Sequence, residues 1–281
     1  MSLFELREPA SALTHGVGLV AALAAARHLW KMSFAATDNP SWYPRESERY
    51  HAGKSASILI FGLTLIACYA ASTAFHGIPV EGENLRRLQR LDHAGIYLLI
   101  AGTYTPIAWA LMRGPWRWGT LGTVWSIALI FMIHVLDDGA PPVWISTITY
   151  LVMGWGALFC YHRLTFDYTH RALLPLPLGG VFYSVGAIVN LLHWPSPYPG
   201  TFGSHPLFHL FVIAGSACHV WFMASVVIPA HEPAFASPKF AWRRPSLAPI
   251  PIDVSPARTR ENPYGIRRRD DSHADQGPSS S

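Results

Sequence analysis

Apolar stretches of about twenty residues recur along the first 230 residues, separated by short polar breaks that carry most of the charge. A helix needs roughly 20 apolar residues to cross the hydrocarbon core of a bilayer, with a range of about 17–25. Seven stretches meet that length, at about 11–32, 56–76, 93–112, 118–136, 143–161, 172–192 and 207–229. The pattern predicts an all-α integral membrane protein in which residues 1–230 form a bundle of seven transmembrane helices.

The composition favours membrane insertion over a soluble helical protein. Only 14% of the residues are charged, against about 25% in an ordinary soluble domain. Seven nearly uncharged stretches, joined by loops as short as five residues, make a soluble protein with buried helices the weaker alternative. The first stretch also has the length of a signal-peptide core. Glu5 and Glu8 outnumber Arg7 before it, which is the wrong charge for a signal, so we expect a first helix.

The composition changes at His231. The last 51 residues contain eight prolines, eight basic residues and six acidic residues, with no helical or strand period. Such a segment cannot bury enough apolar surface to offset the entropy of ordering, so we predict a disordered tail over residues 231–281. Residues 1–230 contain 13 basic and 11 acidic residues, and they have no basic stripe interleaved with aromatic residues. We therefore expect membrane lipids, and no nucleic acid, as partners.

Helices that alternate in direction bring the unusual polar residues to one membrane face. Histidine and aspartate at membrane depth are costly and usually functional. The opposite face carries mostly arginine and lysine. On the first face we expect His15, His76, Asp92, His93, His134, Asp137, Asp138, His193, His205 and His209.

Two spacings indicate a metal site on that face. Ser72 and His76 lie four residues apart at the end of the second helix, and His205 and His209 lie four apart at the start of the seventh. Three histidines are the ligand set of a catalytic zinc ion, with a fourth position open for water. Zn²⁺ is favoured over copper or iron, because the residues on this face include no thiolate ligand. They also include no obvious set of two histidines and one carboxylate. Asp92 could hold or deprotonate the water.

These residues also have ordinary structural explanations. Asp92 precedes an apolar run, as the N-cap of a helix does, and Ser72 could bond a carbonyl one turn earlier. His219 lies ten residues beyond His209, about 15 Å along a helix. We expect His219 to be a buried, hydrogen-bonded polar residue and not a ligand. His15, His93 and His134 are expected to have supporting or structural roles.

Several segments together carry a family resemblance. They are Glu8–Gly16, Ser72–His76, Leu91–Tyr97, Ile100–Pro106 and His205–His219. They resemble the signature segments of the hemolysin III family, which belongs to the progestin and adipoQ receptor superfamily. That superfamily includes the adiponectin receptors and is similar to the alkaline ceramidases. The segments occur in the family's order and span all seven helices.

The resemblance implies a seven-helix bundle with a zinc ion held by His76, His205 and His209. It also implies that Asp92 lies on the water bound to zinc, and that Ser72 is the family's serine near the metal. Family members are associated with lipid or amide hydrolysis, with receptor signalling in animals and with haemolytic activity in bacteria. The Pro- and Arg-rich tail departs from the compact family pattern.

The hypothesis that follows is a membrane zinc hydrolase that acts on a lipid amide or ester. Asp92 would act as the general base, and Ser72 would donate a hydrogen bond to the developing oxyanion. The alternative is a non-enzymatic receptor or stress sensor in which zinc ties the second helix to the seventh. A pore-forming haemolysin ranks lowest, because no stretch is amphipathic as a channel-lining helix would be.

The expected location is a bacterial-type plasma membrane. For the orientation of the bundle in that membrane, two indications disagree. The family is usually drawn with the zinc face towards the cytoplasm. In this chain four lysines and arginines lie on that side, against eight in the opposite loops and eight more in the tail. The positive-inside rule therefore favours a cytoplasmic tail.

The composition of the tail generates one prediction. Truncation after about residue 232 is expected to leave the bundle folded and inserted, because the tail has no apolar face to bury. Membrane fractionation and thermal unfolding of the truncated protein check this. A truncated protein that fails to insert, or that unfolds at a clearly lower temperature, would show that the tail packs on the bundle.

Overall fold

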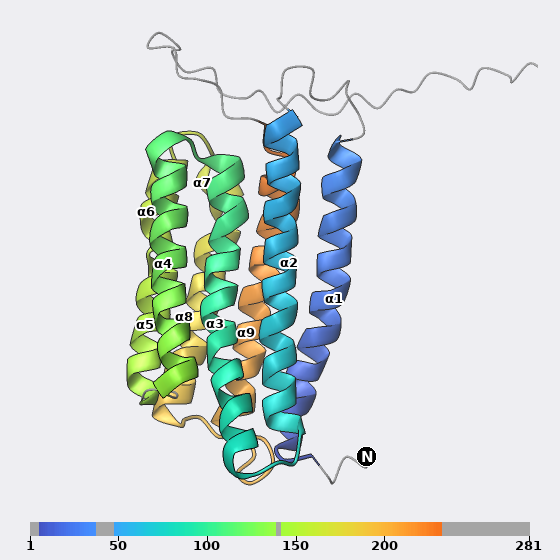
Figure 1. Cartoon of the computed structure of the whole chain (residues 1–281), viewed down its shortest axis with the longest axis vertical. Coiled ribbons are helices and arrows are strands. Elements are labelled where there is room, and N and C mark those ends of the chain that lie inside the picture. Colours follow the sequence, from blue (N-terminus) through green and yellow to red (C-terminus); the bar gives the residue numbers. More distant parts are fainter. Residues whose placement is uncertain (1–5, 38–47, 139–141, 232–281) are drawn as a thin grey trace, which may run out of the picture. The chain divides into compact units, whose positions relative to one another are not determined.

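The computed structural model describes residues 6–37, 48–138 and 142–231, and every regular element in them is a helix (Figure 1). The first four are α1 (Pro9–Thr37), α2 (Glu48–Gly77), α3 (Gly82–Leu111) and α4 (Gly114–Asp138). They are followed by α5 (Val143–Trp155), α6 (Ala157–Leu164), α7 (His170–Leu173), α8 (Pro175–Leu192) and α9 (Ser204–Phe222). A short π-helix, Met223–Val227, continues α9. Residues 232–281, where the disordered tail is predicted, lie outside the described residues.

In the described part of the chain these helices form seven spans that are long and apolar enough to cross a membrane, which confirms the predicted fold class. Single helices α1 to α4 form the first four. The fifth combines α5 with α6, the sixth α7 with α8, and the seventh α9 with the π-helix. The fifth span is interrupted at Gly156. The sixth is interrupted before Pro175, whose missing N–H cannot continue the hydrogen-bond ladder of a helix.

Several helices extend beyond the apolar stretches that predicted them. The clearest case is α3, which begins at Gly82 although its apolar run begins near residue 93. Its first turns are held by ion pairs of Glu83 with Arg86 at 2.9 Å and with Arg87 at 3.6 Å. Side chains three and four residues apart support a helix in this way. Since hydropathy measures only the length within the bilayer, it misses such a polar extension.

The centre of the bundle is α3, the most buried of the seven spans. It packs closely on α2 at two glycines. A Cβ atom at Gly102 would collide with the side chain of Thr64, and one at Gly95 would lie 3.1 Å from Cα of Cys68. Small residues allow such close approach between membrane helices. The position of α2, and of the side chains at its end, is therefore fixed against α3.

At the opposite end of the bundle from the start of α1, a fully buried lysine holds the end of the last span. Nζ of Lys54 donates hydrogen bonds to the carbonyl oxygens of Ile228 at 3.1 Å and Ala230 at 2.9 Å. Its exposed fraction is 0%. These carbonyls lack intrahelical partners at a helix end, and a cation there also interacts favourably with the helix dipole.

Candidate metal centre

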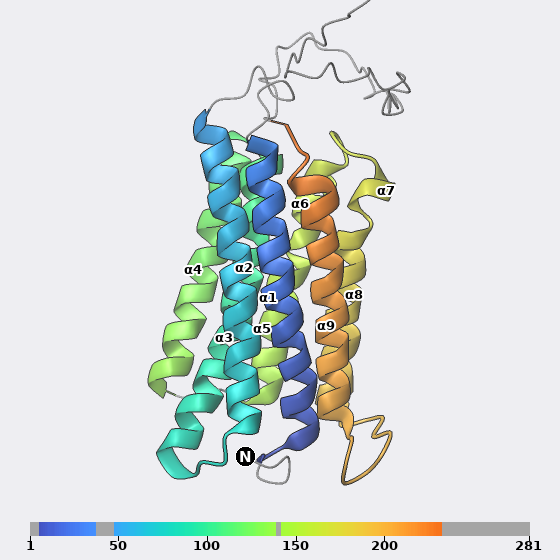
Figure 2. The same ribbon diagram turned by 90° about the vertical axis from the view of Figure 1, so that its right-hand side faces the viewer.

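The three predicted histidines converge where the end of α2 meets the start of α9. The start of α1, the α2–α3 connection and the α8–α9 connection lie at this same end of the bundle (Figure 2). One ring nitrogen from each of His76, His205 and His209 lies within 4.8 Å of the others, close enough to hold a metal ion. His76 is 2% exposed and His209 is 1% exposed. The structure thus brings together the three histidines that the spacing argument grouped, while their binding of a metal stays a prediction.

His76 and His205 face each other through nitrogens that carry lone pairs. Nδ1 of His76 lies 2.6 Å from Oε2 of Glu8, and because a carboxylate only accepts, this nitrogen carries the hydrogen. Nδ1 of His205 donates in the same way to Oδ1 of Asn190 at 2.8 Å. In the neutral rings both Nε2 atoms are then bare, and they lie 3.2 Å apart. Two facing lone pairs repel unless a positive charge is shared between them.

The third histidine is oriented by a threonine of α1. Oγ1 of Thr14 lies 3.0 Å from Nδ1 of His209. Its own hydrogen is donated within α1, to the carbonyls of Ala10 and Ser11 at 3.0 and 2.9 Å. Thr14 therefore accepts from His209, which leaves the Nε2 lone pair of His209 for the cluster. An oxygen acceptor on the second nitrogen is the usual support of a metal-binding histidine.

A further contact fixes the segment before α1 over the end of α2. Arg7 donates to the carbonyl of Phe75 at 2.6 Å and pairs with Oε1 of Glu8 at 2.6 Å. The backbone N–H of Glu8 donates to the carbonyl of His76 at 2.9 Å. Glu8 is therefore held both by its backbone and by its carboxylate where it can orient His76.

Sequence reasoning assigned no role to the three oxygen partners. Glu8 and Thr14 lie in the first signature segment, and Glu8 falls on the histidine face by the alternation of helix direction. Asn190 is an amide near the end of an otherwise apolar run, which is a signal in its own right because polar groups at membrane depth need partners. None of these signals identifies which histidine each residue contacts.

Asp92 and Ser72 lie beside the cluster and form a second polar group with His15. Oγ of Ser72 lies 2.6 Å from Nδ1 of His15 and also interacts with the carboxylate of Asp92. The His15 ring stacks on that of His209, with 3.5 Å between the ring centroids. The N-cap explanation of Asp92 is wrong, because the N-cap of α3 is Glu81 and Asp92 lies in the helix interior. His15 thus lies against Ser72 and His209, and its supporting role stays a prediction.

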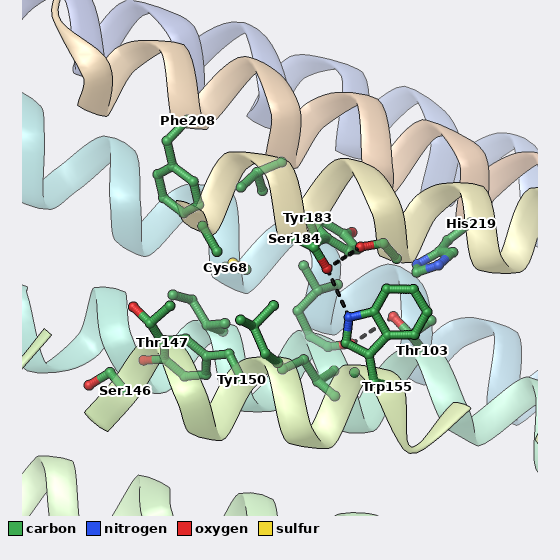
Figure 3. Close-up of a pocket in the computed structure, with 18 of the residues that line it drawn as sticks. Cys68, Thr103, Ser146, Thr147, Tyr150, Trp155, Tyr183, Ser184, Phe208 and His219 are labelled. Atoms are coloured by element: carbon green, nitrogen blue, oxygen red, sulfur yellow. Dashed lines mark hydrogen bonds between the residues drawn. The ribbon is translucent and has the colours of Figure 1, made fainter. Parts of the chain in front are cut away.

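A cavity of about 410 Å³ opens from this polar group into the bundle. His15, Ser72, Asp92, His205 and His209 line it, and apolar side chains of α3, α5, α8 and α9 form most of the remainder. Figure 3 shows Phe208 towards one end and Thr103, Trp155 and His219 towards the other. Between α5 and α8, Nε1 of Trp155 donates to Oγ of Ser184 at 2.9 Å. The cavity is therefore polar at the end lined by the histidines and largely apolar beyond it.

The other histidines of the first face do not join the cluster. His93 and His193 line the cavity, and His219 lies deeper in it, as its position in the sequence requires. His219 is buried and is absent from the group of possible ligands found among the described residues. Its burial and its absence from that group agree with our expectation, but its Nδ1 atom has no hydrogen-bond partner among the described residues.

Seven long apolar helices around a polar cluster define an integral, multi-pass membrane protein. A family model described as haemolysin-III related matches residues 5–220. The chain therefore belongs to the haemolysin III family.

Individual relatives agree with this assignment. The chain is 32% identical over 231 residues to Hemolysin-3 of Bacillus cereus, covering 82% of this chain and 95% of that protein. It is 32% identical over 217 residues to the Hemolysin-3 homolog of Bacillus subtilis, covering 76% and 92%. More distantly, it is 26% identical over 168 residues to the human monocyte to macrophage differentiation factor, covering 58% and 66%.

Proposed function

We propose that this protein is a zinc-dependent hydrolase of lipid amides or esters. One observation carries the proposal: ring nitrogens of three histidines lie within 4.8 Å of one another at the polar end of an apolar cavity, and Nδ1 of each ring has an oxygen partner. The cavity admits a lipid chain, and the bond to be cleaved would then lie at the cluster. A site that only tied α2 to α9 would need no such cavity.

The donor set fits Zn²⁺. Three neutral imidazoles, each with its second nitrogen bonded to an oxygen, match the ligands and outer contacts of catalytic zinc sites. A zinc ion bound there would polarise a carbonyl group and lower the pKa of water close to it. The Glu8 carboxylate adds a negative charge that makes His76 a stronger donor.

Asp92 takes the role of general base in this proposal. Its carboxylate borders the cavity next to the cluster, where it can accept a proton from the attacking water and later return it to the leaving group. Ser72 contacts Asp92 and so positions this carboxylate. To donate to the developing oxyanion, as we expected from the sequence, the Ser72 hydroxyl must turn away from Asp92.

The second candidate is a receptor in which the metal has a structural role. It is favoured by the position of the cluster, which connects the end of α2 to the start of α9 and would brace the bundle. The two functions differ in what Asp92 and the cavity are needed for, and the third experiment below separates them.

The metal content of a ligand variant tests the site. Purified protein is expected to hold about one zinc ion per chain, and His209→Ala to lose most of it, because two imidazoles bind zinc far more weakly than three. Elemental analysis by mass spectrometry measures this, with His219→Phe as a matched control that keeps its zinc. Full zinc occupancy in His209→Ala, or none in the wild type, would contradict the assignment.

Glu8 tests the role of the outer contacts. Glu8→Gln keeps an oxygen that can accept from Nδ1 of His76 but removes the charge, so zinc affinity is expected to fall by roughly 10–100-fold, as for other outer partners of metal-binding histidines. Competition with a chelator of known affinity measures the change. Glu83→Gln, whose carboxylate pairs with arginines at the exposed start of α3, should leave the affinity unchanged.

Asp92 separates the hydrolase from the receptor. Asp92→Asn is isosteric and keeps a partner for Ser72, so zinc content and melting temperature should barely change. Removal of the base is expected to slow hydrolysis by roughly 10²–10⁴-fold. Turnover of a lipid amide or ester that the wild type cleaves gives the answer. Equal turnover in both proteins would exclude Asp92 as the base, and a wild type that cleaves nothing across a broad lipid panel would support the receptor.

A further inference from the structure

The cavity extends over nearly the same length along four separate spans. From the level of the histidine cluster inwards, its lining residues fall in four ranges: Asp92–Ile107 on α3, Ser146–Tyr161 on α5 and α6, Leu176–Asn190 on α8 and His205–His219 on α9. Each range advances fourteen or fifteen residues, about 21–22 Å at the rise of a helix. Four independent measurements thus agree on the depth of the cavity.

A layer of large apolar side chains closes the deep end. Three or four residues beyond the last lining residue, each span carries a buried side chain: Leu111 on α3, Leu164 on α6, Leu173 on α7 and Phe222 on α9. Their exposed fractions are 3% or less, and all four belong to one hydrophobic core. They do not line the cavity, so the cavity ends before it reaches them. We call these four residues the floor.

The depth of the cavity matches one extended lipid chain. Carbon–carbon bonds of about 1.5 Å and bond angles near 111° advance such a chain by about 1.25 Å per carbon. A depth of about 21–22 Å is therefore spanned by roughly 17 carbons. The volume of about 410 Å³ lies within the range of pockets for small ligands and suits a single chain.

We propose that the floor limits the chain length of the bound lipid, so that the cavity selects a chain of about 16–18 carbons. A shorter chain leaves a void above the floor, whose walls lose contacts that a longer chain would make. A longer chain meets the floor before its polar end reaches the histidine cluster. The inference deepens the proposed function and rests on it only for the placement of that polar end.

Gly180 offers a way to shorten the cavity without a collision. It lies ten residues from Asn190, about 15 Å deeper along α8. The lining residues of α8 recur every three or four positions and include Gly180, so a side chain at this position points into the cavity. A Cβ atom there would meet no other atom within 4 Å. A leucine at this position would therefore occupy the part of the cavity nearest the floor.

The lipids that the full-length protein retains test the proposal. The protein is incubated in vesicles that contain equal amounts of lauric, palmitic, stearic and behenic acid, and is then purified. Mass spectrometry compares the bound acids with their content in the bilayer. Palmitic and stearic acid are expected to be enriched roughly tenfold over both lauric and behenic acid, because filling a void in a packed interior is favourable. Equal enrichment of all four acids, a preference for lauric or behenic acid, or no retained acid overturns the proposal.

Variants assign the preference to the depth of the cavity. Gly180→Leu is expected to reverse the ratio of stearic to lauric acid, because a chain of about twelve carbons spans the remaining 15 Å or so. Gly119→Leu is the matched control: its Cβ would also meet no atom within 4 Å, but it lies on the exposed face of α4 and does not line the cavity. It should keep the wild-type preference. An unchanged preference in Gly180→Leu overturns the assignment.

A variant of the floor tests the limit from the other side. Leu164→Ala removes apolar atoms from the floor and is expected to raise the share of behenic acid relative to stearic acid. If this variant does not fold, the comparison of Gly180→Leu with Gly119→Leu still decides. A folded Leu164→Ala protein with the wild-type profile would show that the floor does not set the length.

The test does not depend on catalysis. The profile of bound acids is to be measured with and without a chelator, and it requires neither zinc nor turnover. A preference for palmitic and stearic acid in a protein without zinc or hydrolase activity would refute the proposed function and leave the length limit standing. Conversely, hydrolysis without any preference among the four acids would refute only the length limit.

Discussion

The approach of two imidazole nitrogens at the junction of α2 and α9 is the contact on which the site depends. Bare Nε2 atoms of His76, which is buried, and of His205, which is half-buried, lie 3.2 Å apart. Their orientation is imposed from outside by Glu8 and Asn190, which engage the opposite ring nitrogens. The polar group of His15, Ser72 and Asp92 and the mouth of the cavity are arranged around this contact.

The architecture follows from the sequence because the hydrocarbon core of a bilayer accepts only helices with a sufficiently long apolar stretch. Each crossing needs a minimum apolar length, so seven spans could be counted directly, and their alternation brought His76 to the same end as His205 and His209. Spacing then identified the three histidines, since residues four apart share a helix face. These inferences need only helix geometry and chain direction.

The rest of the site depends on packing, which helix geometry alone does not specify. The choice of Thr14 as partner of His209, and of Asn190 as partner of His205, depends on the rotation of α1 and α8 about their axes. That rotation is set by close contacts such as Gly18 of α1 against Tyr69 and Gly186 of α8 against Phe211. The early start of α3 was also hidden, because its polar turns lie beyond the apolar run, and this is why Asp92 could be mistaken for a cap.

The contact between Thr14 and His209 joins residues that are 195 positions apart, one in the first helix and one in the last. During synthesis the chain therefore carries Glu8, Thr14 and His76 into the membrane well before His205 and His209 emerge from the ribosome. Until then His76 has neither of the other two histidines of the cluster beside it. The three histidines can therefore come together only after the seventh span has inserted in the correct direction. The contacts that form the site are consequently among the last to form during assembly.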